Sequence, residues 1–130
     1  QLVQLHGAES PELCAALQKQ TQVIKVFRVS GNEDAQMLIK PYEDCTDYFL
    51  FDTLATDYGG TGKKFDWSFF EKNRFSKPVF LSGGIGYNDV DSIKKLYQKN
   101  PYFAIDINSK FEILPGNKDI NLLKKFKDQL

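Results

Sequence analysis

Short apolar runs alternate with segments of helical character along the whole chain. Runs of aliphatic, β-branched and aromatic residues, each bounded by polar or turn-forming residues, predict strands at residues 2–5, 23–27, 48–52, 78–82 and 103–107. The intervening and final segments predict helices at residues 11–20, 32–40, 66–72, 89–99 and 119–129. Ser10 ahead of Pro11 is typical of a helix start, because serine caps free amide groups and proline suits the first helical position.

The last of these helices shows the clearest amphipathic pattern. Its apolar residues recur at three- and four-residue spacing, which predicts one buried stripe made of Ile120, Leu123, Phe126 and Leu130. Charged residues cover the opposite face, among them Lys124, Lys125 and Lys127. We interpret these lysines as a solvated helix face rather than as a binding patch.

A strand followed by a helix about every 25 residues predicts right-handed βαβ units and an α/β fold with a parallel sheet. Two architectures fit this pattern. One is a five-stranded doubly wound sheet, and the other is part of a (β/α)₈ barrel, which normally needs about 200 to 250 residues. Periodicity does not choose between them.

Composition indicates one ordinary globular domain. The 130 residues carry 17 basic and 17 acidic side chains, and 42% of them are hydrophobic and 14% aromatic. So much aromatic surface excludes disorder, and the charge balance speaks against a nucleic-acid-binding stripe or a membrane-surface helix. No apolar run approaches the ~20 residues of a membrane span. With only two cysteines, we expect a reducing, cytoplasmic compartment.

Candidate chemistry collects just after the predicted strands, where function lies in both architectures. Gly83 and Gly84 follow the fourth strand, and glycines there let backbone amide groups approach an anion. Ser109 follows the fifth strand, and a short helix beginning near Asn108 would add its positive end. A turn alone could explain the two glycines, but together with the serine-bearing loop they favour a phosphate site.

Two carboxylates close apolar strands, Asp52 and Asp106. Burial of such a group favours its protonated form, so either one could serve as a general acid, or instead cap a helix or accept loop amide groups. His6, the one histidine, follows the first strand, and a lone histidine does not predict a metal site. Cys14 and Cys45 lie away from this edge, and we expect both to be buried and inert.

A glycine-rich segment at residues 59–62 follows the third strand. It does not have the lysine and hydroxyl residue of a P-loop at the required spacing, so it is not a nucleotide signature. Two readings remain for it, a loop that covers the site and a connector that touches no ligand.

Taken together, the motifs resemble the C-terminal part of phosphoribosylanthranilate isomerase. They run in that family's order along essentially all of the chain, and they read VQLHG at 3–7 with Glu9, FDT at 51–53, GGTG at 59–62 with FDW at 65–67, LSGGI at 81–85, ID at 105–106, Ser109 with FE at 111–112, and PG at 115–116 with KD at 118–119.

The resemblance implies a TIM-barrel enzyme that performs an Amadori rearrangement of N-(5-phosphoribosyl)anthranilate without cofactor or metal, in tryptophan biosynthesis. It implies that Asp52 is the general acid, that Asp106 holds a ribose hydroxyl and that His6 lines the mouth of the site. Gly83, Gly84 and Ser109 would then form the phosphate cradle. This chain departs from the family at Lys110, where the family usually has glycine.

By the same resemblance, residues 1–130 form a single (βα)₅ portion of the barrel, corresponding to the family's strands four to eight. The family's cysteine base and its carboxylate-binding arginine belong to the three N-terminal units, which are absent, so we expect the isolated chain to be inactive. We expect its edge strands, residues 2–5 and 103–107, to self-associate or to pair with the missing N-terminal segment.

Two alternatives remain open. The first is a doubly wound domain that binds a phosphate or a protein partner without catalysis, and a switch in strand order would identify it. The second is another sugar-phosphate barrel enzyme such as indole-glycerol-phosphate synthase, for which Lys25 is the residue to examine.

Overall fold

A computed structural model describes residues 1–30, 33–53, 68–99 and 102–130. Its main sheet has five parallel strands that pair in chain order, which are β1 (Leu2–Leu5), β2 (Gln22–Val29), β3 (Tyr48–Thr53), β4 (Val79–Leu81) and β5 (Ala104–Ile105). No switch in strand order occurs in the described sheet, so the doubly wound alternative is wrong and the topology is TIM-like.

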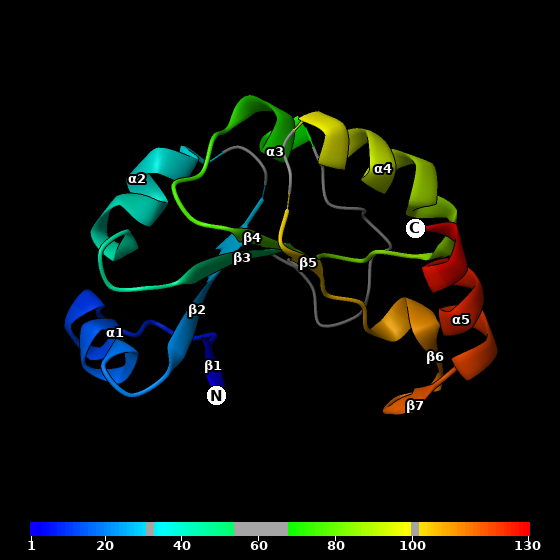
Figure 1. Ribbon diagram of the computed structural model, residues 1–130, viewed down its shortest axis with the longest axis horizontal. Helices are drawn as coiled ribbons and strands as arrows, with labels where there is room; N and C mark the ends of the chain where they lie inside the picture. Colours follow the sequence, from blue (N-terminus) through cyan, green and yellow to red (C-terminus); the bar gives the residue numbers. More distant parts are fainter. Residues whose placement is uncertain (31–32, 54–67, 100–101) are drawn as a thin grey trace.

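The helices lie along one side of this sheet, in an arc from α1 to α5 with the strands inside it (Figure 1). They are α1 (Pro11–Gln18), α2 (Ala35–Ile39), α3 (Ser68–Lys72), α4 (Val90–Lys99) and α5 (Ile120–Gln129), with short 3₁₀ helices η1 (Lys40–Tyr42), η2 (Tyr87–Asp89) and η3 (Ser109–Phe111). Ser10 and Pro11 start α1 as predicted, and the Ser10 hydroxyl accepts from the Leu13 amide at 3.4 Å.

Every predicted strand is present, but several bounds differ. β2 is longer than predicted, and β4 and β5 are shorter, because residues at both ends of those two predicted runs lie outside the paired part of the strand. A short antiparallel hairpin, β6 (Glu112–Leu114) with β7 (Asn117–Lys118), was not predicted. Its turn places Pro115 before Gly116, whose φ of +80° suits the glycine position of a type II turn.

Alternation along the strands separates two apolar layers. The layer between sheet and helices is rich in phenylalanine, including Phe27, Phe49 and Phe51 of the strands and Phe69 and Phe70 of α3. The opposite, inner face of the sheet carries a smaller cluster of Ile24, Val26 and Leu50, with Tyr48 and Phe80 against it. At the carboxyl ends of the strands, the side chains that point to this inner face line the candidate site.

The predicted apolar stripe of α5 is only partly correct. Phe126 is buried, with its ring centroid 4.8 Å from that of Phe111, and Leu123 packs against the same core. Ile120 and Leu130, however, are 57% and 47% exposed. Ile120 is the first residue of α5 and Leu130 follows its last residue, so spacing alone overestimated the buried stripe.

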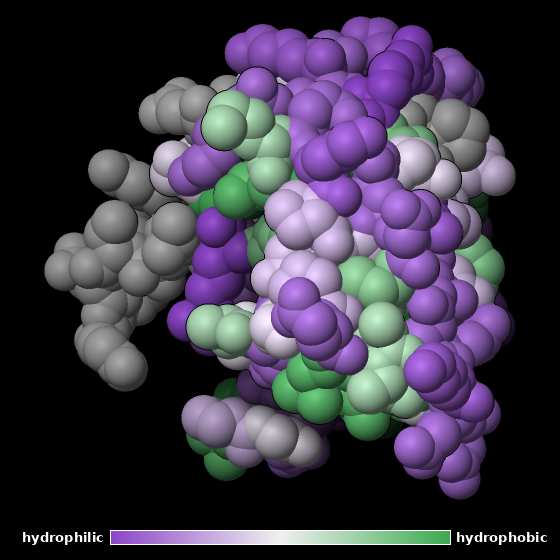
Figure 2. All heavy atoms as spheres, turned by 90° about the vertical axis from the view of Figure 1, so that its left-hand side faces the viewer, coloured by the Kyte–Doolittle hydropathy of each residue, from purple (hydrophilic) through white to green (hydrophobic). Residues whose placement is uncertain are grey.

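The face of the molecule on the side of α1 is largely hydrophilic, with an apolar area in it. Figure 2 views this side and shows apolar surface interrupting the hydrophilic surface at the height of α1. Leu2 at the start of β1 and Leu13 of α1 are both exposed. Within the described residues no helix is long and apolar enough to cross a membrane.

A buried ion pair fixes the loop between β1 and α1. Lys25 lies in the middle of β2 on the helix side and is 3% exposed. Its ammonium group donates to the Gly7 carbonyl at 2.8 Å, to Glu9 Oε2 at 3.0 Å and to the Val26 carbonyl at 3.2 Å. Glu9 Oε1 in turn accepts from the Gly7 amide at 2.9 Å. The peptide groups on both sides of Gly7 are therefore held, directly after His6.

Glycine suits position 7 because the Glu9 carboxylate closes over it. A Cβ atom at Gly7 would lie 2.8 Å from Glu9 Oε1, which is too close. Burial opposes ionisation of Glu9, but hydrogen bonds from backbone amide groups and from Lys25 outweigh it and lower the pKa of this carboxyl group. The stabilisation is therefore present above the ordinary glutamate pKa and is lost as the pH falls through the lowered value.

Glu9→Ala is expected to destabilise the fold more than Lys25→Met. The alanine variant leaves a buried ammonium with carbonyl partners alone, whereas the methionine variant leaves a partly exposed carboxylate that water can solvate. We expect Glu9→Ala to lower the free energy of unfolding by about 2 kcal/mol and Lys25→Met to lower it by about 1 kcal/mol, both measured by urea denaturation. Asp128→Ala, on the exposed end of α5, is the control. A larger loss for Lys25→Met would contradict this account.

Candidate functional site

The carboxyl ends of the strands surround a cavity of about 250 Å³. The structure brings every sequence-predicted site residue to its wall, together with residues that were not predicted as site residues. The predicted residues are His6, Asp52, Gly83, Gly84, Asp106 and Ser109, and the others are Gln4, Leu50, Ser82, Ile85, Asn108 and Lys110. The volume suits a small polar ligand.

Strand alternation explains why these side chains meet. Gln4 and His6 occupy alternate positions at the end of β1, as do Leu50 and Asp52 in β3, so each pair projects to the inner face. Parallel pairing places the ends of all five strands at the same edge of the sheet. Residues separated by about 100 positions, such as His6 and Asp106, therefore line one cavity.

Asp106 is held by the neighbouring strand. Its backbone amide donates to the Leu81 carbonyl at 2.8 Å, and the Ser82 hydroxyl donates to its Oδ2 at 3.4 Å. Ser82 is buried and Asp106 is half-buried, as is Asp52 on β3. Two carboxyl groups thus share the cavity, one with an oxygen fixed by a serine, and such groups accept hydrogen bonds from a polyol.

The loop after β4 has a backbone that requires glycine. Gly83 and Gly84 have φ angles of +99° and +64°, a region that other residues rarely adopt. A Cβ atom at Gly84 would meet nothing within 4 Å, so it is the backbone conformation and not crowding that demands glycine. Further along, the Gly86 amide donates at 2.8 Å to the buried carboxylate of Asp89, which fixes the end of the loop.

The loop after β5 is anchored from the other side. Phe111 of η3 is fully buried, and its carbonyl accepts from the Asp119 amide at 2.8 Å. Lys118 of β7 donates to Asn108 Oδ1 at 2.9 Å and to Glu112 Oε1 at 2.7 Å, and this hydrogen bond lowers the pKa of Glu112. The unpredicted hairpin therefore holds the loop that carries Ser109. The expected short helix near Asn108 is present as the three-residue η3.

The remaining sequence predictions have mixed outcomes. Cys14 and Cys45 are buried as predicted, and desolvation raises the pKa of both thiols. Among the described residues no three His, Cys, Asp or Glu side chains are grouped as a metal site would need. Residues 59–62 lie outside the described part of the chain. Lys25 faces the helices and pairs with Glu9 rather than lining the cavity, so it gives no support to a synthase-like site.

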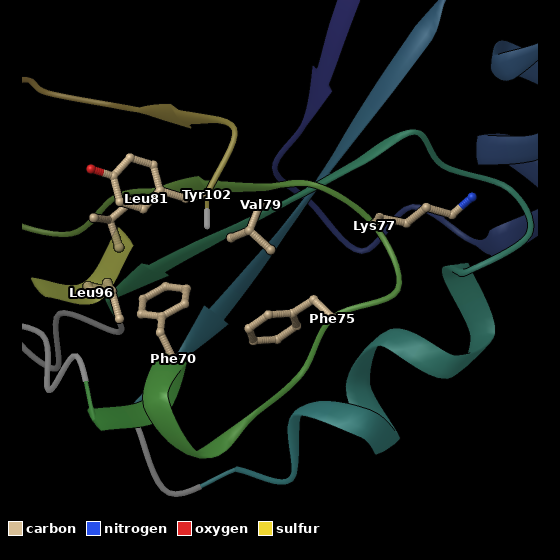
Figure 3. A pocket seen from close by; sticks show the side chains of 7 residues that line it. All are labelled: Phe70, Phe75, Lys77, Val79, Leu81, Leu96 and Tyr102. Atoms are coloured by element: carbon tan, nitrogen blue, oxygen red, sulfur yellow. The ribbon is translucent and has the colours of Figure 1, made fainter. Parts of the chain in front are cut away.

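A second hollow lies between the sheet and α3 and α4. It has a volume of about 30 Å³, room for about one water molecule. In Figure 3 the rings of Phe70 and Phe75 lie side by side below Val79, while the amino end of Lys77 points away from them. We interpret this hollow as a packing gap in the outer core rather than as a ligand site.

Sequence reasoning missed three features of the site that the sequence pattern could have revealed. Gln4 lines the cavity, and its position two residues before His6 on a strand was a sufficient signal. The Lys25–Glu9 pair was also missed, although a lysine inside an apolar strand indicates a buried partner. Asn108 was named only as the start of a helix, yet it lines the cavity.

Comparisons with known proteins agree with this geometry. The family N-(5'phosphoribosyl)anthranilate (PRA) isomerase matches residues 1–129. An N-(5'-phosphoribosyl)anthranilate isomerase of Parabacteroides distasonis is 47% identical over 130 residues, covering 98% of this chain and 58% of the relative. The crystal structure of phosphoribosyl anthranilate isomerase from Thermotoga maritima superposes with a TM-score of 0.80 at 36% identity, over 98% of this chain and 60% of that one.

A further crystal structure of the same kind contains a ligand. It is a phosphoribosyl anthranilate isomerase in complex with reduced 1-(o-carboxyphenylamino)-1-deoxyribulose 5-phosphate, with a TM-score of 0.71 at 30% identity, over 98% of this chain and 58% of that one. This chain thus spans about three-fifths of the length of the relatives that it matches. Its sequence and its fold place it in the N-(5'-phosphoribosyl)anthranilate isomerase family.

Proposed function

We propose that this protein isomerises N-(5'-phosphoribosyl)anthranilate and that the chain supplies the acid and the phosphate site of the reaction. One observation carries the proposal. A single cavity joins the carboxylates of Asp52 and Asp106 to the glycine loop and Ser109, in a chain of this family. A phosphorylated sugar needs both kinds of group, one for its anionic end and one for its ring oxygen and hydroxyls.

Asp52 is the general acid in this proposal. Its proton goes to the ring oxygen of the ribose as the bond between that oxygen and the anomeric carbon breaks, which leaves an iminium group on the opened chain. A base then removes the proton on the adjacent carbon. The resulting enolamine becomes the ketose when its hydroxyl group loses a proton and the former anomeric carbon gains one, which returns the acid and the base to their starting forms. The substrate and the product are isomers, so no oxidant, reductant or cofactor enters the balance.

Asp106 holds a ribose hydroxyl, with Ser82 fixing one carboxylate oxygen and leaving the other for the substrate. The phosphate occupies the other side of the cavity, against the amide groups of Gly83 and Gly84 and the hydroxyl of Ser109. His6 lines the mouth. The ligand of the related complex, a deoxyribulose 5-phosphate, has the phosphate that this arrangement requires.

The family's cysteine base and carboxylate-binding arginine must come from outside these 130 residues. Cys14 and Cys45 are buried, and neither lines the cavity. We therefore propose that the chain forms five consecutive βα units, the fourth to the eighth of the family's barrel. β1 and β5 each pair on one side only within the described sheet, so both edges are available for a further strand or a second copy.

Asp52→Asn is expected to lower kcat of the full-length gene product by about 10² to 10⁴, because asparagine has the shape of the acid but no proton to give. Steady-state assay with N-(5'-phosphoribosyl)anthranilate measures the loss, and the affinity for inorganic phosphate is expected not to fall, because the substitution removes no donor to the anion. Asp128→Asn, at the exposed end of α5, controls for the loss of one negative charge. Unchanged kcat in Asp52→Asn would contradict the assignment.

Gly84→Ala is expected to weaken phosphate binding and to destabilise the fold. An alanine at φ +64° costs about 1 kcal/mol or more, and relaxation of the loop moves the amide groups away from the anion. Isothermal titration with inorganic phosphate and a urea melt measure the two effects. Gly116→Ala, which strains the hairpin turn at φ +80° outside the cavity, is the matched control. Equal phosphate affinities of the two variants would refute the cradle.

The isolated 130-residue chain is expected to bind phosphate but to show no isomerase activity, because it supplies the acid without the base. Analytical ultracentrifugation is expected to show self-association, since both sheet edges expose backbone hydrogen-bonding groups. A catalytically active chain, or one that remains a monomer at high concentration, would be inconsistent with the five-unit assignment.

A further inference from the structure

The cavity has an unbalanced set of charges for a phosphorylated ligand. Asp106 lines it with a carboxylate, and Asp52, the acid of the proposed reaction, adds a second negative charge whenever it has given up its proton. Among the described residues that line the cavity, Lys110 is the only lysine or arginine. A phosphate monoester carries up to two negative charges near neutral pH, so carboxylates on the same wall oppose its binding unless a cation offsets them.

Lys110 lies where both phosphate-side loops meet. It follows Ser109 directly and precedes Phe111, whose full burial against α5 fixes the backbone of η3. The Cβ and Cγ atoms of Lys110 lie 3.7 Å and 3.8 Å from the place that a Cβ atom on Gly86 would take. The side chain of the β5 loop therefore runs along the loop that begins with Gly83 and Gly84.

The ammonium group of Lys110 is available for a ligand. The lysines at positions 25, 40, 99 and 118 form ion pairs with glutamates, at distances from 2.7 Å to 3.5 Å. Lys110 forms no ion pair within the described part of the chain, and its side chain is exposed at the mouth of the cavity. Its stem is held at the base by η3 and its charged end is free to move toward an anion.

We propose that Lys110 is a phosphate-binding residue that selects the dianionic end of the substrate. This inference deepens the proposed function and rests on its phosphate cradle. Glycine and serine at the loop ends supply neutral donors. Among the described residues of the cavity wall, Lys110 adds the one positive charge, which a lysine delivers as a point charge. The family usually has glycine at this position, which lets the backbone come close to a phosphate. In this chain the lysine prevents that close approach but adds a contact between opposite charges.

Binding of inorganic phosphate to the purified protein tests the proposal. Lys110→Ala and Lys110→Gln are expected to raise the Kd about tenfold at low ionic strength, whereas Lys110→Arg, which keeps the charge, stays within about threefold. The ratio between variant and wild type is expected to shrink as KCl rises from about 0.02 M to about 0.5 M, because salt screens a charge contact. Lys124→Ala, an exposed lysine of α5, is expected to match the wild type.

Gly84→Ala separates this inference from the proposed function. Suppose that the wild type binds phosphate, that Gly84→Ala does not, and that Lys110→Ala binds it with the affinity of the wild type. The phosphate cradle is then supported, and the role of Lys110 is overturned. If the wild type binds no phosphate at millimolar concentration, the cradle and the role of Lys110 both fall. Equal losses in Lys110→Ala and Lys124→Ala would show an effect of net charge alone, and would also overturn the role of Lys110.

Discussion

Parallel pairing of the strands in chain order is the constraint on which the rest of this structure depends. Five strands run in the same direction, so their carboxyl ends share one edge and each following loop starts there. Two acids, a glycine turn and a serine loop then need no special contacts to meet. They meet because each lies at the carboxyl end of a strand or in the loop that follows it.

The loops at this edge are held mainly from the side away from the cavity. Lys25 and Glu9 fix the peptide groups around Gly7 from the helix side, and Phe111 fixes η3 from beneath α5. Asp89 does the same for the amide of Gly86. This arrangement holds the backbone of the cavity wall in place from outside the cavity, which is what a preorganised site requires.

The sequence predicted the elements and the site better than the finer packing. Strands were recognisable because apolar runs end at turn residues, and site residues because function collects after parallel strands. The choice between two architectures needed strand order, which periodicity does not encode. The hairpin was missed because β7 has two residues, although Pro115 and Gly116 marked its turn. The exposure of Ile120 depends on what packs against α5, which spacing cannot report.

The central claim is that a phosphate binds between the loops after β4 and β5. Amide chemical shifts of the protein, followed by NMR during a titration with inorganic phosphate, test it most directly. The account predicts that the largest shifts fall on Gly83, Gly84 and Ser109, with smaller ones on Asn108 and Lys110. Saturable shifts centred on α5 or on the hollow near Phe70, with the β4 and β5 loops unchanged, would contradict it.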